Sequence, residues 1–177
     1  MSGVPALSIV AAVSGTGKTT LLEKLIAELT RRGLRVGAVK NDAHRFQIDH
    51  AGKDTWRFTQ AGARATAIVS GEQYALIQKT ETRKDLLAVL ELLEDVDIIL
   101  VEGFKAGPLP RIEVVRRARG DAIVSDRDLL LAVATDIPDL TADKPCFALD
   151  DAAGIAEFII ARFISPSVPR FSPPPQP

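Results

Sequence analysis

The sequence predicts an α/β protein in which a predominantly parallel sheet is flanked by helices within a single domain. Apolar runs typical of strands alternate along the chain with segments of helical periodicity. Several of the apolar runs are continuous, as in strands that are buried on both faces of a parallel sheet. With 177 residues, 46% of them hydrophobic and 25% charged, the chain has the length and composition of a globular domain with a full core.

The expected elements follow one another in the order that this fold requires. Strands are expected at residues 7–12, 35–40, 65–70, 73–79, 97–102, 112–116 and 129–134, and helices at 19–32, 53–62, 83–94 and 150–163. The third and fourth strands are expected to pair across the turn Ser70-Gly71-Glu72. The strand at 97–102 is expected beside the first strand in the centre of the sheet, because both are apolar on both faces.

The composition changes only at the far end of the chain. The segment 165–177 is rich in proline and serine, so it is expected to be a disordered tail that follows a nucleotide-binding domain at 1–164. The net charge of −1 gives no electrostatic reason to expect nucleic acid or a membrane surface as a partner. The apolar run Ile98–Val101 is too short to span a membrane. The single cysteine, Cys146, excludes an internal disulfide framework and is expected to be a small buried residue on a strand of a cytoplasmic protein.

The segment 12–19, with the sequence AVSGTGKT, separates the first strand from the first helix. Backbone N–H groups of such a glycine-rich turn can point together at an anion, and the helix N-terminus adds its own free donors. Lys18 is expected to reach the β- and γ-phosphates and Thr19 to hold Mg²⁺, although Ala12 stands where a P-loop usually has its first glycine. The pattern therefore predicts a fold of the P-loop NTPase type. The expected nucleotide-binding residues are Ser14, Gly15, Thr16, Gly17, Lys18, Thr19 and Thr20.

A P-loop also needs a carboxylate on the opposite side of the metal. Glu102 ends the apolar strand 98–101, and an ionised carboxylate there is costly unless a cation lies beside it. We expect Glu102 at the Mg²⁺, the alternative being an exposed acid paired with Lys105. Asp42, at the start of a polar loop that leaves the same edge of the sheet, is expected to contact Mg²⁺ directly or through water. Lys18, Glu102 and Asp42 are thus the expected catalytic residues.

Base recognition is assigned to Asp136, at the end of the last long strand. A carboxylate can accept hydrogen bonds from both N1–H and the exocyclic amine of guanine, whereas adenine offers no such pair of donors. Asp136 is therefore the candidate for reading guanine, the alternative being an aspartate that only forms a turn before Ile137 and Pro138.

Three blocks of sequence carry a resemblance to a known family. They are the P-loop Ser14–Leu21, the loop and helix residues Lys40, His44, Asp49, Gly52-Lys53-Asp54 and Ala61-Gly62-Ala63, and the pair Val101–Lys105 and Pro110–Val114. In this order and spacing the chain, from about residue 7 to 160, resembles the MobB family of molybdopterin-guanine dinucleotide biosynthesis adaptor proteins. Asn41 and Ala51 depart from the pattern, since histidine and proline are common at these positions.

The resemblance implies a cytoplasmic homodimer that binds GTP with Mg²⁺ and hydrolyses it weakly. Its implied partner is the guanylyltransferase that attaches GMP to molybdopterin, with molybdopterin itself as a further candidate. An arginine supplied in trans speeds hydrolysis in many P-loop proteins, and Arg45, Arg57 and Arg111 are the candidates. The alternative function is a small-molecule kinase or ATP-dependent ligase on the same fold, with Asp42 or Asp49 as the catalytic base.

Overall fold

The computed structural model describes residues 3–42, 46–138, 140 and 143–164. Its internal contacts divide the chain into two compact units, one formed by Met1–Asn41 with Leu90–Pro177 and the other by Asp42–Val89. The first is called the sheet unit below and the second the inserted unit. The predicted tail at 165–177 lies outside the described residues.

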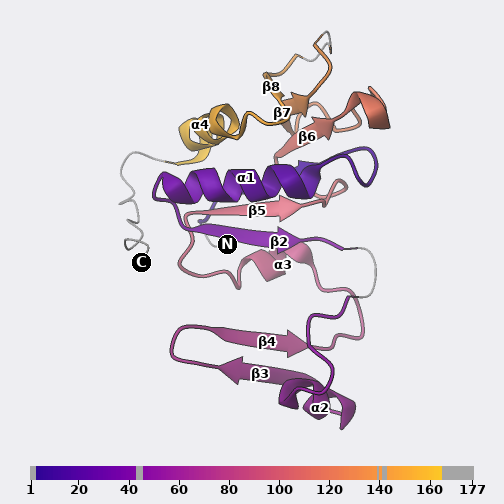
Figure 1. The fold of residues 1–177 in the computed structure, drawn as a ribbon, viewed down its shortest axis with the longest axis vertical. Coiled ribbons are helices and arrows are strands. Elements are labelled where there is room, and N and C mark those ends of the chain that lie inside the picture. Colours follow the sequence, from indigo (N-terminus) through magenta and orange to yellow (C-terminus); the bar gives the residue numbers. More distant parts are fainter. Residues whose placement is uncertain (1–2, 43–45, 139, 141–142, 165–177) are drawn as a thin grey trace. The chain divides into compact units, whose positions relative to one another are not determined.

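The sheet unit is built on one parallel sheet with the strand order β2-β5-β1-β6-β7-β8 (Figure 1). The strands are β1 (Ala6–Val10), β2 (Val36–Lys40), β5 (Ile98–Glu102), β6 (Arg111–Val115), β7 (Leu130–Thr135) and β8 (Cys146–Ala148). The parallel sheet and the position of β5 beside β1 are confirmed. Because all the strands run in one direction, the loops that follow β1, β5, β6 and β7 leave from the same edge.

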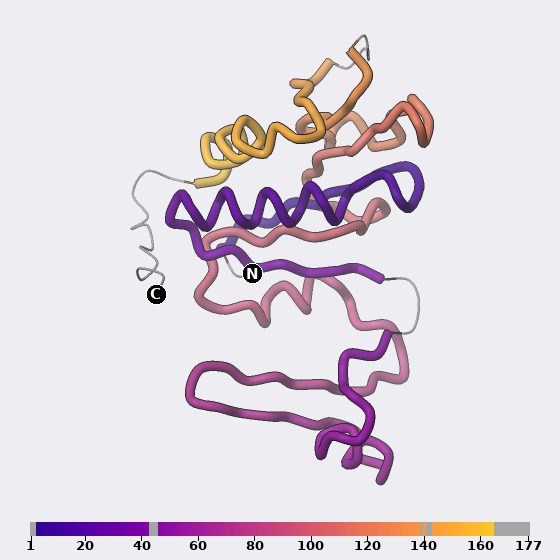
Figure 2. Tube along the Cα trace, in the orientation of Figure 1, coloured from indigo at the N-terminus to yellow at the C-terminus, as the bar shows by residue number. Residues whose placement is uncertain are grey.

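Two helices cover one face of this sheet, α1 (Lys18–Arg31) and α4 (Ala152–Phe163). The Cα trace shows them beside each other along the strands (Figure 2). Leu25 of α1 and Ile155 of α4 are fully buried against strand residues such as Leu7, so one core joins both helices to the sheet.

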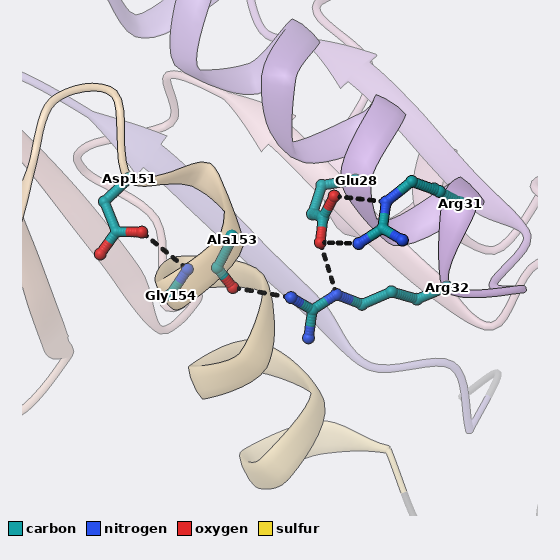
Figure 3. Close-up of polar contacts among 6 residues, drawn as sticks. All are labelled: Glu28, Arg31, Arg32, Asp151, Ala153 and Gly154. Atoms are coloured by element: carbon teal, nitrogen blue, oxygen red, sulfur yellow. Dashed lines mark hydrogen bonds and ion pairs between the residues drawn. The ribbon is translucent and has the colours of Figure 1, made fainter.

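A group of hydrogen bonds at the C-terminal end of α1 links α1 to α4 (Figure 3). The Glu28 carboxylate accepts hydrogen bonds from Arg31 at 2.7 and 2.9 Å and from Arg32 at 2.7 Å. Arg32 also donates to the carbonyl oxygen of Ala153 in the first turn of α4, at 3.0 Å. The hydrogen bonds from Arg31 and Arg32 to Glu28 hold the pKa of this carboxyl group at about 2, well below its usual 4.5.

The inserted unit contains a short helix and a hairpin. Its elements are α2 (Asp54–Gln60), β3 (Ala65–Val69) and β4 (Tyr74–Gln78). The helix α3 (Leu86–Leu90) contains the position in the sequence, after Val89, at which the inserted unit ends. The strands pair antiparallel, as predicted, and Ser70 N–H donates to the Gln73 carbonyl at 2.8 Å across the turn.

The sequence predictions need correction for one helix, for two elements that were not predicted and for the burial of Cys146. The helix expected at 83–94 is only one turn long, since Leu90 is its sole buried side chain and a helix without a buried face has little to stabilise it. The short edge strand β8 and a 3₁₀ turn at Arg117–Arg119 were not expected. Cys146 does lie on a strand, but it is exposed because β8 is the last strand of the sheet. None of the helices in the described ranges is both long enough and apolar enough to cross a membrane.

Candidate functional site

The loop between β1 and α1 leaves a helix N-terminus without a protein cap. Gly17 occupies the N-cap position at φ = +108°, a conformation in which a side chain would be strained. In the described part of the chain no side chain accepts a hydrogen bond from this end of α1, and the first turn carries no acidic residue. The N–H groups and the positive end of the helix dipole therefore have no side-chain partner of this kind, which is the local arrangement that an anion site at a helix N-terminus needs.

Two side chains of the loop bind its own backbone. The Thr16 hydroxyl, which is buried, donates to the carbonyl oxygen of Val13 at 2.8 Å, and Lys18 Nζ donates to the same oxygen at 3.4 Å. Thr16 therefore holds the shape of the loop, whereas the partly exposed Lys18 ammonium can exchange a weak contact for a phosphate. Ser14, Gly15, Thr19 and Thr20 are exposed along the loop and its helix.

Thr19 and Glu102 meet at the carboxyl edge of the sheet. The Thr19 hydroxyl donates to Glu102 Oε1 at 3.0 Å, across 83 positions of sequence. Adjacent ligands of an octahedral Mg²⁺, with bonds of about 2.1 Å, lie about 3.0 Å apart. These two oxygens are therefore spaced as two neighbouring Mg²⁺ ligands would be. The alternative partner of Glu102, Lys105, instead donates to the carbonyl oxygen of Ala12 at 3.4 Å.

The two residues fit Mg²⁺ better than a transition metal. Mg²⁺ commonly takes one or two protein oxygens and completes its shell with water and phosphate oxygens. Among the described residues, no three His, Cys, Asp or Glu side chains come together as a set that could hold a metal ion by themselves. The oxygen pair thus suits a metal that arrives with a nucleotide.

The chain leaves Glu102 through two residues in the left-handed region. Gly103 has φ = +87° and Phe104 has φ = +67°. A Cβ on Gly103 would lie 3.3 Å from the backbone oxygen of Asn41, and Gly103 N–H donates to the Ile9 carbonyl at 2.9 Å. The end of β5 is therefore held closely between β1 and β2, which fixes the position of the Glu102 carboxylate.

Arg111 fixes the loop that follows Phe104. This side chain is almost fully buried, and its guanidinium donates to the carbonyl oxygens of Lys105, Gly107 and Leu109. Its prediction as an arginine that acts in trans is wrong, because a guanidinium with three backbone partners inside its own subunit cannot reach a second one. The sequence showed the charge and not this burial.

Two arginines that the sequence analysis did not assign lie against the P-loop. A Cβ placed on Gly17 would lie 3.2 Å from Arg116 Nη2, and one placed on Gly15 would lie 3.2 Å from Arg119 Nη2. Both arginines follow β6, the neighbour of β1 in the sheet. The rule that parallel strands end at one edge could have found them, since the run 116–119 begins at the last residue of the strand predicted at 112–116.

Asp136 directly follows β7 (Leu130–Thr135) at the same edge of the sheet. Its Oδ1 accepts a hydrogen bond from Arg117 N–H at 2.7 Å, so the carboxylate holds the turn that carries the arginines. Asp136 also lines an open hollow of about 340 Å³, together with residues of the β7–β8 edge that include Ile137, Pro138 and Phe147. This volume is within the range of small-molecule sites.

The remaining predicted site residues belong to the inserted unit or lie outside the described residues. Asp49 Oδ1 accepts from His50 N–H at 2.9 Å and from the Thr55 hydroxyl at 3.0 Å. Asp42 is assigned to the inserted unit, and its role at the metal stays a prediction. Arg57 is exposed and pairs with Asp54 at 3.4 Å. His44 and Arg45 lie outside the described residues.

The parallel sheet, the glycine loop after β1 and the Thr19–Glu102 pair define an α/β protein of the P-loop NTPase type. Comparison with known families is more specific. The profile of "Molybdopterin guanine dinucleotide synthesis protein B" (MobB) matches residues 6–136. The chain belongs to the MobB family.

Relatives and solved structures agree with this assignment. The chain is 38% identical over 164 residues to the molybdopterin-guanine dinucleotide biosynthesis adapter protein of Escherichia coli K12, covering 89% of this chain and 92% of the relative. It is 39% identical over 160 residues to the protein of the same name from Haemophilus influenzae, covering 88% of each chain. A crystal structure of molybdopterin-guanine biosynthesis protein B matches with a TM-score of 0.67 at 31% identity, over 90% of this chain and 99% of the other. MobB of Bacillus subtilis, at 22% identity and a TM-score of 0.70 over 90% of this chain and 98% of the other, supports the fold.

Proposed function

We propose that this chain is a GTP-binding adaptor in molybdopterin-guanine dinucleotide biosynthesis, with weak GTPase activity, that assists the guanylyltransferase which attaches GMP to molybdopterin. The names of the relatives at 38% and 39% identity support the pathway. The single observation that carries the nucleotide part is the 3.0 Å contact between Thr19 and Glu102 beside an uncapped helix N-terminus. That arrangement is suited to a phosphate chain with its Mg²⁺.

Gly17, Lys18, Thr19 and Glu102 each have a separate role in this proposal. The N–H groups around Gly17 bind phosphate oxygens, and Lys18 leaves the Val13 carbonyl to pair with the β- and γ-phosphates. Thr19 and Glu102 would hold the Mg²⁺ with their hydroxyl and carboxylate oxygens. When bound, Mg²⁺ neutralises part of the phosphate charge.

Guanine selection is assigned to Asp136. The bond from Arg117 N–H engages Oδ1 and orients the carboxylate at the rim of the 340 Å³ hollow. A carboxylate oriented in this way can accept from the two adjacent donors of guanine, whereas adenine presents an acceptor at N1. Asp136 therefore favours GTP over ATP.

An equilibrium titration with non-hydrolysable GTP and ATP analogues, with and without Mg²⁺, tests the proposal. We expect selective GTP binding that Lys18→Ala weakens at least about 100-fold, because a charge-assisted phosphate contact is lost. Lys24→Ala, which removes an exposed lysine from the same helix, is the matched control and should bind normally. Asp136→Asn should lower the ratio of GTP to ATP affinity.

The opposite results are equally clear. If Lys18→Ala bound GTP normally, the proposal that the P-loop binds the phosphates would be rejected. Selective ATP binding would reject the adaptor proposal in favour of a small-molecule kinase or ATP-dependent ligase.

The homodimer is the second part of the proposal, and the hairpin of the inserted unit supports it. By the register of the strand pairing, Val69, Tyr74 and Leu76 lie on one face of the hairpin, and each is at least 60% exposed. A cluster of large apolar side chains on a two-stranded sheet is costly in water unless another surface covers it. We assign this surface, called the hairpin face below, to the contact between two copies of the chain.

A further inference from the structure

Three arginines stand on the turn that follows β6. They are Arg116, at the N-cap of the 3₁₀ turn, and Arg117 and Arg119 within it. Arg119 N–H donates to the Arg116 carbonyl at 2.8 Å, and Arg117 N–H donates to Asp136 at 2.7 Å. The turn is therefore fixed from within and from β7, so its side chains leave from defined positions.

Two of the three guanidinium groups contact the P-loop at its glycines. Arg116 Nη2 lies 3.2 Å from the place that a Cβ of Gly17 would occupy, and Arg119 Nη2 lies equally close to that of Gly15. At either position a side chain would have to displace the arginine or be displaced by it. Arg117 is not near the Cβ position of any described glycine, so it can serve as the control for Arg116 and Arg119.

This arrangement gathers positively charged groups that form no ion pair among the described residues. Arg116 and Arg119 join Lys18 and the positive end of α1 around one short loop, in a chain whose net charge is −1. Within the described ranges, neither arginine forms an ion pair with a carboxylate. Arg116 Nε is moreover buried without a hydrogen-bond acceptor among those residues. Like charges brought together repel, and a buried donor without a partner is costly, so the cluster calls for a multiply charged anion.

We propose that Arg116 and Arg119 bind the phosphate chain of the nucleotide in cis, as part of the same subunit's P-loop site. The inference rests on the proposed function and adds two phosphate-binding residues to it. Arginine is suited to this task because its planar fork can donate two parallel hydrogen bonds to phosphate oxygens.

The arginines must move when the phosphates bind. Both guanidinium groups lie against the glycines of the loop, and the hollow between them and Ala12, Val13 and Thr16 has a volume of only about 10 Å³. This is room for one water molecule, so the phosphates bind at Gly17 and Lys18 and not in this hollow. The long side chains therefore swing from the glycines onto the phosphate oxygens, while the backbone of the turn stays in place through Asp136.

The test compares single variants of the three arginines in the full-length chain. We expect Arg116→Ala to weaken binding of the GTP analogue about 10- to 100-fold and the more exposed Arg119→Ala about 3- to 10-fold, as the loss of a charge-assisted hydrogen bond predicts. Arg117→Ala makes the same change of charge on the same turn and should bind as the parent chain does. Tripolyphosphate, which has no base, should compete with the analogue less well in the Arg116 and Arg119 variants than in the parent chain.

Two further measurements distinguish phosphate binding by Arg116 and Arg119 from a purely structural role of these residues. Arg116→Lys keeps the charge without the fork, so it should recover part of the affinity. The decrease of affinity with rising salt should be shallower in Arg116→Ala and Arg119→Ala than in the parent chain, because each variant has lost one charged contact. Thermal melting identifies a variant that has failed to fold, and the exposed Arg119 then still tests the proposal.

The outcomes also separate this inference from the proposed function. If the parent chain binds GTP and both variants bind it equally well, the arginines are not phosphate ligands and the proposed function stands. If Arg117→Ala loses as much affinity as they do, general charge explains the effect and the inference is overturned. If the parent chain binds neither analogue, the proposed function itself fails.

Discussion

The two units of the chain differ in how far they bury their large apolar side chains. In the sheet unit, α1 and α4 bury side chains such as Leu25 and Ile155 completely against the parallel strands. In the inserted unit, β3 and β4 form a two-stranded sheet whose large apolar side chains are mostly exposed. A two-stranded sheet is at best marginally stable alone in water. The sheet unit can therefore account for its own stability, whereas the hairpin depends on what covers it.

The largest expected effect contrasts one leucine from each unit. Leu25→Ala should destabilise the protein by about 3 kcal/mol, because it removes a fully buried side chain and leaves a cavity in the core. Leu76→Ala removes the same atoms from a side chain that is 60% exposed, so the change should be within about 0.5 kcal/mol for a monomer. Urea unfolding of both variants measures the two differences.

The same Leu76 variant tests the hairpin face in the dimer. If two copies meet there, Leu76→Ala should shift sedimentation toward the monomer at low concentration and destabilise the protein in a concentration-dependent way. Leu92→Ala is the control, since Leu92 is 65% exposed outside this face. An unchanged dimer in the Leu76 variant would place the contact elsewhere.

The same contrast explains what could be predicted from the sequence. The central strands were predictable because runs such as Ile98–Val101 are apolar on both faces, and the loop at Gly17 because its phosphate chemistry depends on local sequence. The helix expected at 83–94 was overpredicted because helical periodicity does not show whether another surface exists to bury its leucines. The burial of Arg111 depends on carbonyl groups presented by a folded loop, and the position of Arg116 depends on strand order. Residue spacing does not show the burial of Arg111, whereas the position of Arg116 follows once the strand at 112–116 is placed in the parallel sheet.

The two predicted metal ligands belong to different units, Glu102 to the sheet unit and Asp42 to the inserted unit. Glu102→Gln in the sheet unit should weaken GTP binding about 10-fold more in the presence of Mg²⁺ than in EDTA, because an amide is a poorer ligand than a carboxylate. Asp42→Asn makes the matching change in the inserted unit and should have a smaller effect if Asp42 acts through water. If Glu102→Gln lost the same GTP affinity with and without Mg²⁺, Glu102 would not be a metal ligand, in spite of its 3.0 Å contact with Thr19.

The smallest expected effect is a dependence of stability on pH that belongs to the sheet unit. The pKa of Glu28 is lowered to about 2 by its bonds to Arg31 and Arg32, against an ordinary 4.5 that we take for the unfolded chain. Between these values the unfolded chain binds more protons, so stability must fall as the pH falls. The contribution of Glu28 is therefore complete above about pH 4.5 and is lost progressively toward pH 2.

Glu28→Gln should flatten this part of the pH profile, as measured by urea unfolding between pH 6 and about pH 2.5. The matched control is Glu81→Gln in the inserted unit, where Glu81 meets Arg64 at 2.9 Å with both side chains more than 60% exposed. A surface pair of this kind contributes little, so its removal should leave the profile unchanged. If the control flattened the profile as much as Glu28→Gln, acid sensitivity would not be confined to the contact that joins α1 to α4, and the energetic contrast between the units would be weaker than their burial suggests.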